Sequence, residues 1–338
     1  MKIGVCGTGR MGSSIAQRLI SVGHEVGVWN RDSAKTKPLV DGGARAFAYG
    51  QYLGQRYKDF PNLIWMHGND FQSWRNPEHD ALVQAVALGI KSVDPNHLHT
   101  VELNFLTSGS LDDPSWAPII GLNAAYTYYP TYAQVLREYN RPNFKPVFMV
   151  EANYEFEHNL NTDGGSTQNL RRQAYWTMLS GATGQFYGSF YTWQFPREWQ
   201  TRLDTPGISQ LSYLGQLFAP RKWHDLVPDQ DHAVVTRGWG RYSTTGSITT
   251  NTYATSARTS DGSLVITYMP TIRTITVDMS KLAGITTARW FDPTKGSYVA
   301  ADGSPFVNVG GRRFTPPGNN SAGDGDWVLV LEAAARPQ

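Results

Sequence analysis

The spacing of apolar residues changes twice along the 338-residue chain, and each change limits the possible fold. Residues 1–45 predict strand, amphipathic helix, strand and short polar helix, as in a Rossmann-like βαβα fragment. Residues 46–229 alternate strands with helices, which is typical of a parallel sheet or barrel. Residues 230–338 predict short strands between turns, which is typical of a β-sandwich. We therefore expect an α/β part followed by an all-β part, in three domains with these boundaries.

The individual elements follow from the same patterns. In the front part, strands are expected at Lys2–Cys6 and Val26–Trp29. The middle part predicts helices at Glu78–Leu88 and Thr167–Leu179 and strands at Asn62–Met66, Thr100–Phe105, Gly121–Tyr126, Pro146–Val150 and Gly184–Trp193. The last part predicts strands at Ile248–Thr259, Ser263–Met269, Arg273–Val277, Thr287–Phe291 and Trp327–Leu331.

A glycine motif joins the first predicted strand to the first helix. Gly7 permits a tight turn, Gly9 lets a pyrophosphate approach the backbone, and Gly12 lets helix and strand pack closely. The second strand ends at Asn30 and Arg31, and an arginine at this place suits the 2′-phosphate of NADP. These five residues are the candidate cofactor site. The alternative is a transplanted fragment that binds little.

Composition excludes several function classes. Thirty basic and twenty-eight acidic side chains leave a formal charge of +2, which indicates neither nucleic acid nor an anionic membrane as partner. The single cysteine, Cys6, excludes an intramolecular disulfide and a cysteine-based zinc site, and we predict no metal. No apolar stretch approaches the ~20 residues that span a bilayer. The first residues do not resemble a signal peptide, so the chain as written is expected in the cytoplasm.

Two carboxylates follow predicted strands of the middle part. Asp70 comes shortly after the strand that contains Trp65, and Glu151 directly follows the strand at 146–150. Side chains at the carboxyl ends of different barrel strands converge on one rim. A pair of carboxyl groups is what glycoside hydrolysis needs, one as acid and one as nucleophile or base. Alternatively, each carboxylate caps a helix or pairs with an arginine, and Glu155 is a second candidate for the role of Glu151.

Three motifs in this order, YGQYLGQRYKDFPNLIWMHGNDFQ, PVFMVEANYE and GATGQFYGSFYTWQFPREW, resemble the apiosidase-like glycoside hydrolases, family 140 and its relatives. The segments ARWFDPTKGSY and GDWVLVLEA resemble that family's C-terminal module, which is named for collagen binding. The resemblance covers residues 46–335. It implies a β/α barrel that acts with retention and needs no cofactor, with Asp70 as acid/base and Glu151 as nucleophile. It also implies a secreted or periplasmic protein.

The resemblance implies a carbohydrate substrate, either a polysaccharide or an oligosaccharide. Aromatic faces suit the apolar faces of sugar rings, and polar tips bind hydroxyl groups. The residues expected to contact the sugar lie at or near predicted strand ends; they are Trp65, His67, Asn69, Tyr126, Tyr154 and Trp193.

The first 45 residues depart from this family. The stretch IGVCGTGRMGSSIAQRLISVGHEVGVWNR resembles the start of the 6-phosphogluconate and β-hydroxyacid dehydrogenase family. A complete barrel has eight strands, and only five are predicted from residue 46 onward, so we expect a chimera with an incomplete and impaired barrel. Two alternative functions stay open: an NADP-dependent oxidoreductase, and a non-catalytic carbohydrate-binding protein that acts through its β-sandwich.

Overall fold

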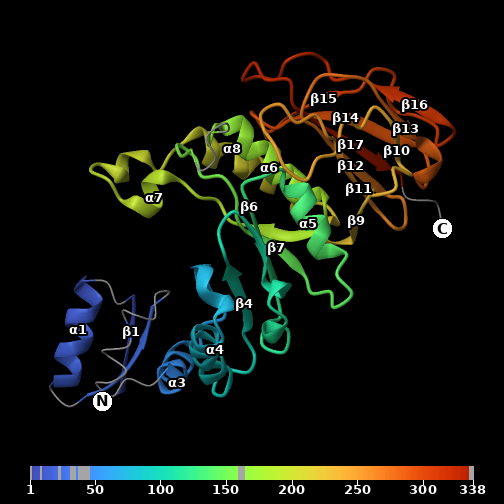
Figure 1. Ribbon diagram of the computed structural model, residues 1–338. Helices are drawn as coiled ribbons and strands as arrows, with labels where there is room; N and C mark the ends of the chain where they lie inside the picture. The colour runs from blue at the N-terminus through green and yellow to red at the C-terminus, as the bar shows by residue number, and fades with distance from the viewer. Residues whose placement is uncertain are drawn as a thin grey trace. The chain divides into compact units, whose positions relative to one another are not determined.

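The computed structural model describes residues 2–7, 10–21, 24–30, 36, 46–158 and 164–334. Contacts within the chain group it into two compact units, Met1–Tyr126 and Thr127–Gln338, which run from blue to green and from green to red in Figure 1. Each unit is described by itself. The three domains expected from the sequence stay a prediction.

Unit 1 begins with a small parallel sheet. Strands β1 (Lys2–Cys6) and β2 (Glu25–Trp29) pair in parallel, and α1 (Arg10–Ser21) connects them. Ala16 of α1 packs against Val28 on one face of this sheet. The two strands and the helix predicted from the sequence are confirmed. The predicted polar helix after β2 falls largely on residues 31–35 and 37–45, outside the described residues.

The other face of this small sheet is covered by α3 (Ala46–Tyr57). Gly4 and Gly27 are register partners on β1 and β2, and the side chain of Tyr49 lies directly on them. A Cβ atom on Gly4 would lie 1.5 Å from Cε2 of Tyr49, and one on Gly27 would lie 1.7 Å from Cβ of Tyr49. Only glycine leaves room for this contact, which joins the front sheet to the rest of unit 1.

The remainder of unit 1 contains the first strand–helix segments of the middle part. Its strands and its long helix are β3 (Ile64–Phe71), α4 (Pro77–Lys91), β4 (Leu98–Leu103), β5 (Thr107–Gly109) and β6 (Asn123–Thr127), with 3-10 turns at Gln72–Arg75, Ser110–Asp112 and Pro114–Trp116. β3 and β4 pair in parallel, as expected for a β/α fold, and β5 lies beside β6. Helix α4 begins at Pro77 because the side chain of Asn76 accepts a hydrogen bond from the N–H of Glu78.

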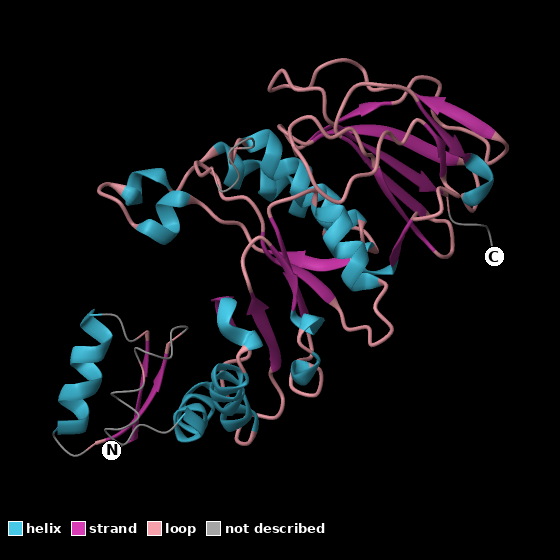
Figure 2. Cartoon of the chain, in the orientation of Figure 1, coloured by secondary structure: helices cyan, strands magenta, loops and turns pink. Residues whose placement is uncertain are grey.

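Unit 2 begins with helices around a second pair of parallel strands, β7 and β8 (Figure 2). The elements are α5 (Thr131–Tyr139), β7 (Val147–Glu151), α6 (Thr167–Leu179), β8 (Ala182–Gln185), α7 (Phe190–Gln194) and α8 (Pro206–Phe218), with 3-10 turns at Trp199–Arg202 and Trp223–Asp225. The prediction of one strand from Gly184 to Trp193 is wrong at its end. β8 stops at Gln185, and the hydroxyl of Ser189 accepts from the N–H of Tyr191 and starts α7.

The last part of the chain forms two antiparallel sheets, which confirms the predicted β-sandwich. One sheet has the order β10-β13-β16 and the other β15-β14-β17-β12-β11-β9. Their strands are β9 (Leu226–Pro228), β10 (Val235–Arg237), β11 (Thr255–Thr259), β12 (Leu264–Met269), β13 (Ile275–Asp278), β14 (Thr286–Asp292), β15 (Ser297–Ala300), β16 (Gly311–Phe314) and β17 (Trp327–Ala333), with a 3-10 turn at Met279–Lys281.

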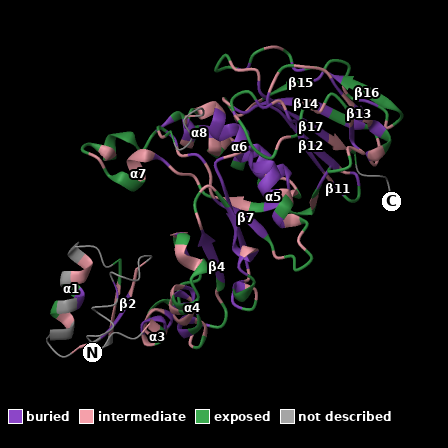
Figure 3. Ribbon diagram, in the orientation of Figure 1, coloured by how far each residue is buried: buried purple, intermediate pink, exposed green. Residues whose placement is uncertain are grey.

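Strand β12 is buried on both faces (Figure 3). Ile266 and Tyr268 lie in a core that includes residues of α6 and α8, whereas Val265 and Met269 lie in the core between the two sheets. Because alternate side chains of a strand point to opposite faces, a strand between two cores needs apolar residues at consecutive positions. The sandwich therefore shares a core with the helices of unit 2.

Candidate functional site

The end of β3 has an unusual backbone around Asp70. Gly68, Asn69 and Asp70 have φ angles of 94°, 78° and 51°, so three consecutive residues lie in the left-handed region. The pairing of β3 with β4 shifts register over the same stretch, between Gly68 and Phe71. A Cβ atom on Gly68 would lie 2.2 Å from the carbonyl oxygen of Glu102, so this position needs glycine. Left-handed non-glycine residues cost about 1–3 kcal/mol each and cluster at functional sites.

The carboxyl group of Asp70 is held by a tyrosine from β6. The hydroxyl of Tyr126 donates to Oδ1 of Asp70 at 2.9 Å, and the side chain of Tyr126 is almost completely buried. Asp70 itself is half-buried. The structure thus brings together two residues that the sequence predicted for the site, and a rigid phenol orients the carboxyl group.

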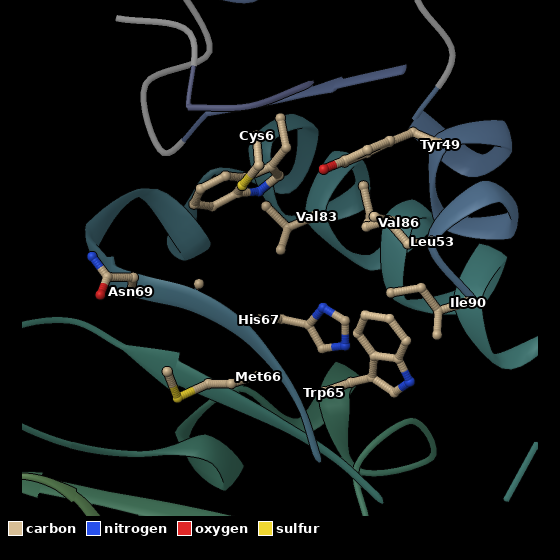
Figure 4. A pocket seen from close by; sticks show the side chains of 12 residues that line it. Cys6, Tyr49, Leu53, Trp65, Met66, His67, Asn69, Val83, Val86 and Ile90 are labelled. Carbon is tan, nitrogen blue, oxygen red and sulfur yellow. The ribbon is translucent and has the colours of Figure 1, made fainter. Parts of the chain in front are cut away.

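The three other predicted residues on β3 line a cavity of about 250 Å³ within unit 1 (Figure 4). Trp65 packs in a cluster with Ile90 of α4, and its Nε1 donates to Asp94 at 2.8 Å. His67 is buried, whereas Asn69 is exposed. The other lining residues are mostly apolar; they are Cys6, Trp29, Tyr49, Leu53, Met66, Gly68, Val83, Val86 and Ile90. Trp65 and His67 are therefore engaged in the packing of unit 1.

His67 forms a buried pair with His99 of β4. Nε2 of His67 lies 3.0 Å from Nδ1 of His99, and the two rings stack with their centroids 5.2 Å apart. Burial lowers the pKa of His67 to about 3, and the charge of His99 acts in the same direction. Burial also lowers the pKa of His99 to about 4. Both rings are neutral in the folded protein at neutral pH.

This pair makes the stability of unit 1 sensitive to acid. An unfolded histidine has a pKa of about 6.5, so below that pH the unfolded chain binds more protons than the folded one. We expect the free energy of unfolding to fall between pH 6.5 and 5 by up to about 1.4 kcal/mol per pH unit for each ring. Urea unfolding followed by circular dichroism at several pH values measures this slope. The variant His99→Leu should show a shallower slope, and equal slopes would contradict the assignment.

Glu151 is the last residue of β7 and is half-buried. The hydroxyl of the buried Tyr128 donates a short hydrogen bond to its Oε1. Tyr128 was not predicted for the site, although it lies only two residues beyond the strand predicted at Gly121–Tyr126. The loops after β6 and β7 are both bonded to the side-chain amide of Gln173 on α6. This amide accepts from the N–H of Asn153 at 3.1 Å and donates to the carbonyl oxygen of Tyr129 at 3.2 Å.

Glu155, the second candidate for the nucleophile, has a different environment. Its side chain is 1% exposed and accepts from the hydroxyl of Tyr187, from Oγ1 of Thr205 at 2.5 Å and from the N–H of Gly207 at 2.9 Å. Thr205 and Gly207 stand at the start of α8, so this carboxylate anchors that helix to the loop after β7. A buried carboxylate with three donors is poorly placed to attack a sugar, which favours Glu151.

Another glutamate of the segment after β7, Glu157, contacts the predicted residue Trp193. The indole Nε1 of Trp193 on α7 donates to Oε2 of Glu157 at 3.1 Å. Burial and the charge of Glu151 both raise the pKa of Glu157, whereas the indole donor lowers it. The ring of Tyr154 meets that of Trp193 edge-on, with centroids 6.4 Å apart. The structure thus brings the predicted residues Tyr154 and Trp193 together and adds Glu157, which the sequence did not single out.

In the glycine motif, two of the three glycines have the mechanical roles predicted for them. Gly7 has a φ of 83°, and its N–H donates to the carbonyl oxygen of Trp29 at 2.9 Å. A Cβ atom on Gly12 would lie 1.8 Å from the carbonyl oxygen of Gly7, so helix and turn approach closely only with glycine here. Asn30 directly follows β2. Gly9 and Arg31 lie outside the described residues.

The residues that the structure describes offer neither a cluster of metal-binding side chains nor a membrane-spanning helix. Among these residues, no group of three or more histidine, cysteine or acidic side chains is arranged to hold a metal ion. The helices that the structure describes include none with the length and apolar character needed to cross a bilayer.

Comparison with known protein families identifies the middle of the chain. Residues 19–225 match the family model described as "Apiosidase-like, catalytic domain". The chain belongs to the apiosidase-like family. Residues 243–332 match a second model, described as "Putative collagen-binding domain of a collagenase". The first match begins inside α1, so the apiosidase-like model extends across the expected junction at residue 45.

Solved structures agree with this family. A structure named "Glycoside hydrolase" is 26% identical, with a TM-score of 0.75, and the match covers 96% of this chain and 77% of that one. A glycoside hydrolase family 5 protein from Bacteroides vulgatus ATCC 8482 has 23% identity and a TM-score of 0.73, over 95% of this chain and 73% of that one, and shares the fold. This apiosidase-like chain is therefore a glycoside hydrolase.

A curated relative matches a short stretch only. "Glyoxylate/succinic semialdehyde reductase 2, chloroplastic" from Arabidopsis thaliana is 51% identical over 64 residues, which are 19% of this chain. The apiosidase-like chain spans 15% of the length of that reductase. This match gives weak support to the resemblance of the front fragment to NADP-binding proteins.

Proposed function

We propose that this protein hydrolyses glycosidic bonds of a polysaccharide or oligosaccharide with retention, with Asp70 as acid/base and Glu151 as nucleophile. One observation carries the proposal: within the family match, each of these carboxylates lies at the carboxyl end of a parallel strand and accepts a hydrogen bond from a tyrosine hydroxyl. The carboxyl ends of barrel strands are where catalytic residues of this fold are found.

The chemistry assigns a task to each group. Asp70 gives its proton to the glycosidic oxygen while Glu151 attacks the anomeric carbon, so the bond to the leaving group breaks and a glycosyl ester forms. Asp70 then takes a proton from water, which attacks the same carbon and releases Glu151. Tyr126 and Tyr128 hold the two carboxyl groups in position by their hydroxyl donors. Retention needs the carboxyl groups about 5 Å apart.

We further propose that the front sheet takes the place of part of the missing barrel units. The contact of Tyr49 with Gly4 and Gly27 supports this, as does the family match that begins in α1. A complete barrel has three more strand–helix units than are predicted from residue 46 onward, and the two strands of the front sheet do not replace all three. We therefore expect lower activity than that of a family member with a complete barrel. Tyr154 and Trp193 are the proposed sugar contacts beside Glu151.

A panel of 4-nitrophenyl glycosides of neutral pentoses and hexoses tests the reaction. We expect the purified chain to release nitrophenol from at least one of them. Proton NMR of the first sugar product should then show the anomeric configuration of the substrate. Inversion would contradict the assignment of Glu151 as nucleophile, and an inert chain would contradict the hydrolase proposal.

A second candidate is the binding of NADP at the glycine motif. The left-handed turn at Gly7 and the close approach at Gly12 favour it, because a tight turn and close packing of the following helix are the roles of these glycines in a dinucleotide-binding motif. Titration of NADPH fluorescence with the protein measures this affinity. The variant Arg31→Ala should weaken NADPH more than NADH, and no binding at millimolar NADPH would exclude this candidate.

A further inference from the structure

We propose that Gln173 is a positioning residue for the nucleophile Glu151, and that the β-sandwich holds Gln173 in place through the two arginines before it on α6. In this role the sandwich helps to set the geometry of the active site, which a separate binding module does not do. The inference rests on the proposed hydrolase function, because it assigns the contacts that position the nucleophile in that reaction.

The first observation is that α6 is enclosed on every side. Each residue from Asn169 to Thr177 is buried, and Figure 3 colours the helix accordingly. An enclosed helix is normally apolar all round, but this one carries Arg171, Arg172 and Gln173 in succession. Successive residues of an α-helix point about 100° apart, so these three side chains leave α6 in different directions. Buried polar groups are costly unless they are hydrogen-bonded, so each needs partners of its own.

The second observation is that both buried arginines bind the sandwich. Arg171 donates to both carboxylate oxygens of Asp326, at 3.0 and 2.8 Å. Arg172 donates to four main-chain carbonyl oxygens at 2.7, 2.6, 3.1 and 3.0 Å, which belong to Ile248, Thr249, Asn251 and Pro270. Because the donors of a guanidinium form a rigid planar fork, these bonds fix the position of α6 against the sandwich.

The third observation is that Gln173 bonds the two chain segments that carry Glu151 and Tyr128. Its side-chain oxygen accepts from the N–H of Asn153 at 3.1 Å and from Nδ2 of Asn153 at 3.2 Å. Its Nε2 donates to the carbonyl oxygen of Tyr129 at 3.2 Å. Asn153 lies two residues after Glu151, and Tyr129 directly follows Tyr128. One side chain therefore holds both partners of the hydrogen bond between Tyr128 and Glu151.

These contacts form a continuous path from the sandwich to the nucleophile. The arginines hold α6, α6 carries Gln173, and Gln173 holds the segments on either side of the bond from Tyr128 to Glu151. A displacement of about 1 Å at a reacting group can lower a rate by about 10²-fold. Gln173 itself is 2% exposed and cannot contact a bound sugar. Its loss should therefore lower kcat and leave KM nearly unchanged.

Three full-chain variants test this path. Gln173→Met keeps the approximate size of the side chain but removes the hydrogen bonds of its amide. Arg172→Met removes the guanidinium that binds the sandwich carbonyl groups. Val277→Ala is the matched control for lost stability, because Val277 is buried in the core between the two sheets. It should lower the melting temperature and leave kcat unchanged. Circular dichroism checks each fold, and Arg172→Lys replaces Arg172→Met if the latter does not fold.

We expect kcat for the neutral 4-nitrophenyl glycoside to fall about 10–100-fold in Gln173→Met, with KM changed by less than about twofold. Arg172→Met should also lower kcat, and the double variant should be no slower than Gln173→Met, because both substitutions interrupt one path. Gln173→Glu keeps an acceptor, and its protonated form also donates as the amide does. Its kcat relative to the unaltered chain should therefore rise as the pH falls from neutral to mildly acidic.

An unchanged kcat in Gln173→Met would overturn the inference. Independent effects of Gln173→Met and Arg172→Met on kcat would overturn the role of the sandwich, as would an equal loss of kcat in Val277→Ala, because lost stability would then explain the result. If the unaltered chain hydrolyses no glycoside, the hydrolase proposal fails and this inference fails with it. Hydrolysis that is insensitive to Gln173→Met contradicts this inference alone.

Discussion

Glu151→Gln is expected to reduce kcat on an aryl glycoside by a factor on the order of 10³ or more, with the fold unchanged. The amide is nearly the same size as the carboxylate and keeps an acceptor for the hydroxyl of Tyr128, but it is a poor nucleophile. Asp70→Asn should reduce kcat by about 10²–10⁴ because the proton donor is lost. Rates are measured by nitrophenol release and the fold by circular dichroism.

Reaction with azide distinguishes the nucleophile, Glu151, from the acid/base, Asp70. In Glu151→Ala, azide can enter the space of the missing nucleophile and attack the anomeric carbon directly, so the glycosyl azide should have inverted configuration. In Asp70→Ala, the glycosyl ester still forms on Glu151, and azide should give a product with retained configuration. Glu155→Gln is the matched control: it should weaken the anchor of α8 and lower the melting temperature while kcat stays above that of Glu151→Gln. If Glu155→Gln had a lower kcat than Glu151→Gln, the nucleophile would be Glu155 and not Glu151.

Arg171→Leu should lower the free energy of unfolding of unit 2 by about 3–5 kcal/mol. The guanidinium is 1% exposed and donates to both carboxylate oxygens of Asp326, with Nε 3.0 Å from Oδ2 and Nη2 2.8 Å from Oδ1. It also donates to Asp324 and Gln210, each at 2.6 Å. Removing the cation leaves the buried charge of Asp326 without its partner. Urea unfolding followed by tryptophan fluorescence measures the loss.

Two further variants serve as controls for Arg171→Leu. Arg197→Leu removes an arginine whose side chain is 95% exposed, and should change stability by less than about 0.5 kcal/mol. The double variant Arg171→Met with Asp326→Leu removes both buried charges, and should be more stable than Arg171→Leu alone. A single variant as stable as the unaltered chain would show that this ion pair does not hold the helices to the sandwich.

Sequence patterns alone determined much of the architecture. Alternating strands and helices predicted the β/α segments, and α6 has the predicted bounds, Thr167–Leu179, because Ser166 caps its first turn. The turn at Gly7 and the close contact at Gly12 were predictable, since each depends on a residue type and its immediate neighbours. The positions of Asp70 and Glu151 at the carboxyl ends of strands are local features of the same kind.

Only the tertiary structure decided which side chains meet. Tyr128 reaches Glu151, Glu155 is used to anchor α8, and Glu157 lies against Trp193. Arg171 and Asp326 are 155 positions apart in sequence. Periodicity and capping act over a few residues along the chain, so they reveal strands, helices and turns. Partners that are distant in sequence are selected by the packing of those elements, because hydrogen bonds and charges act over a few ångströms in space.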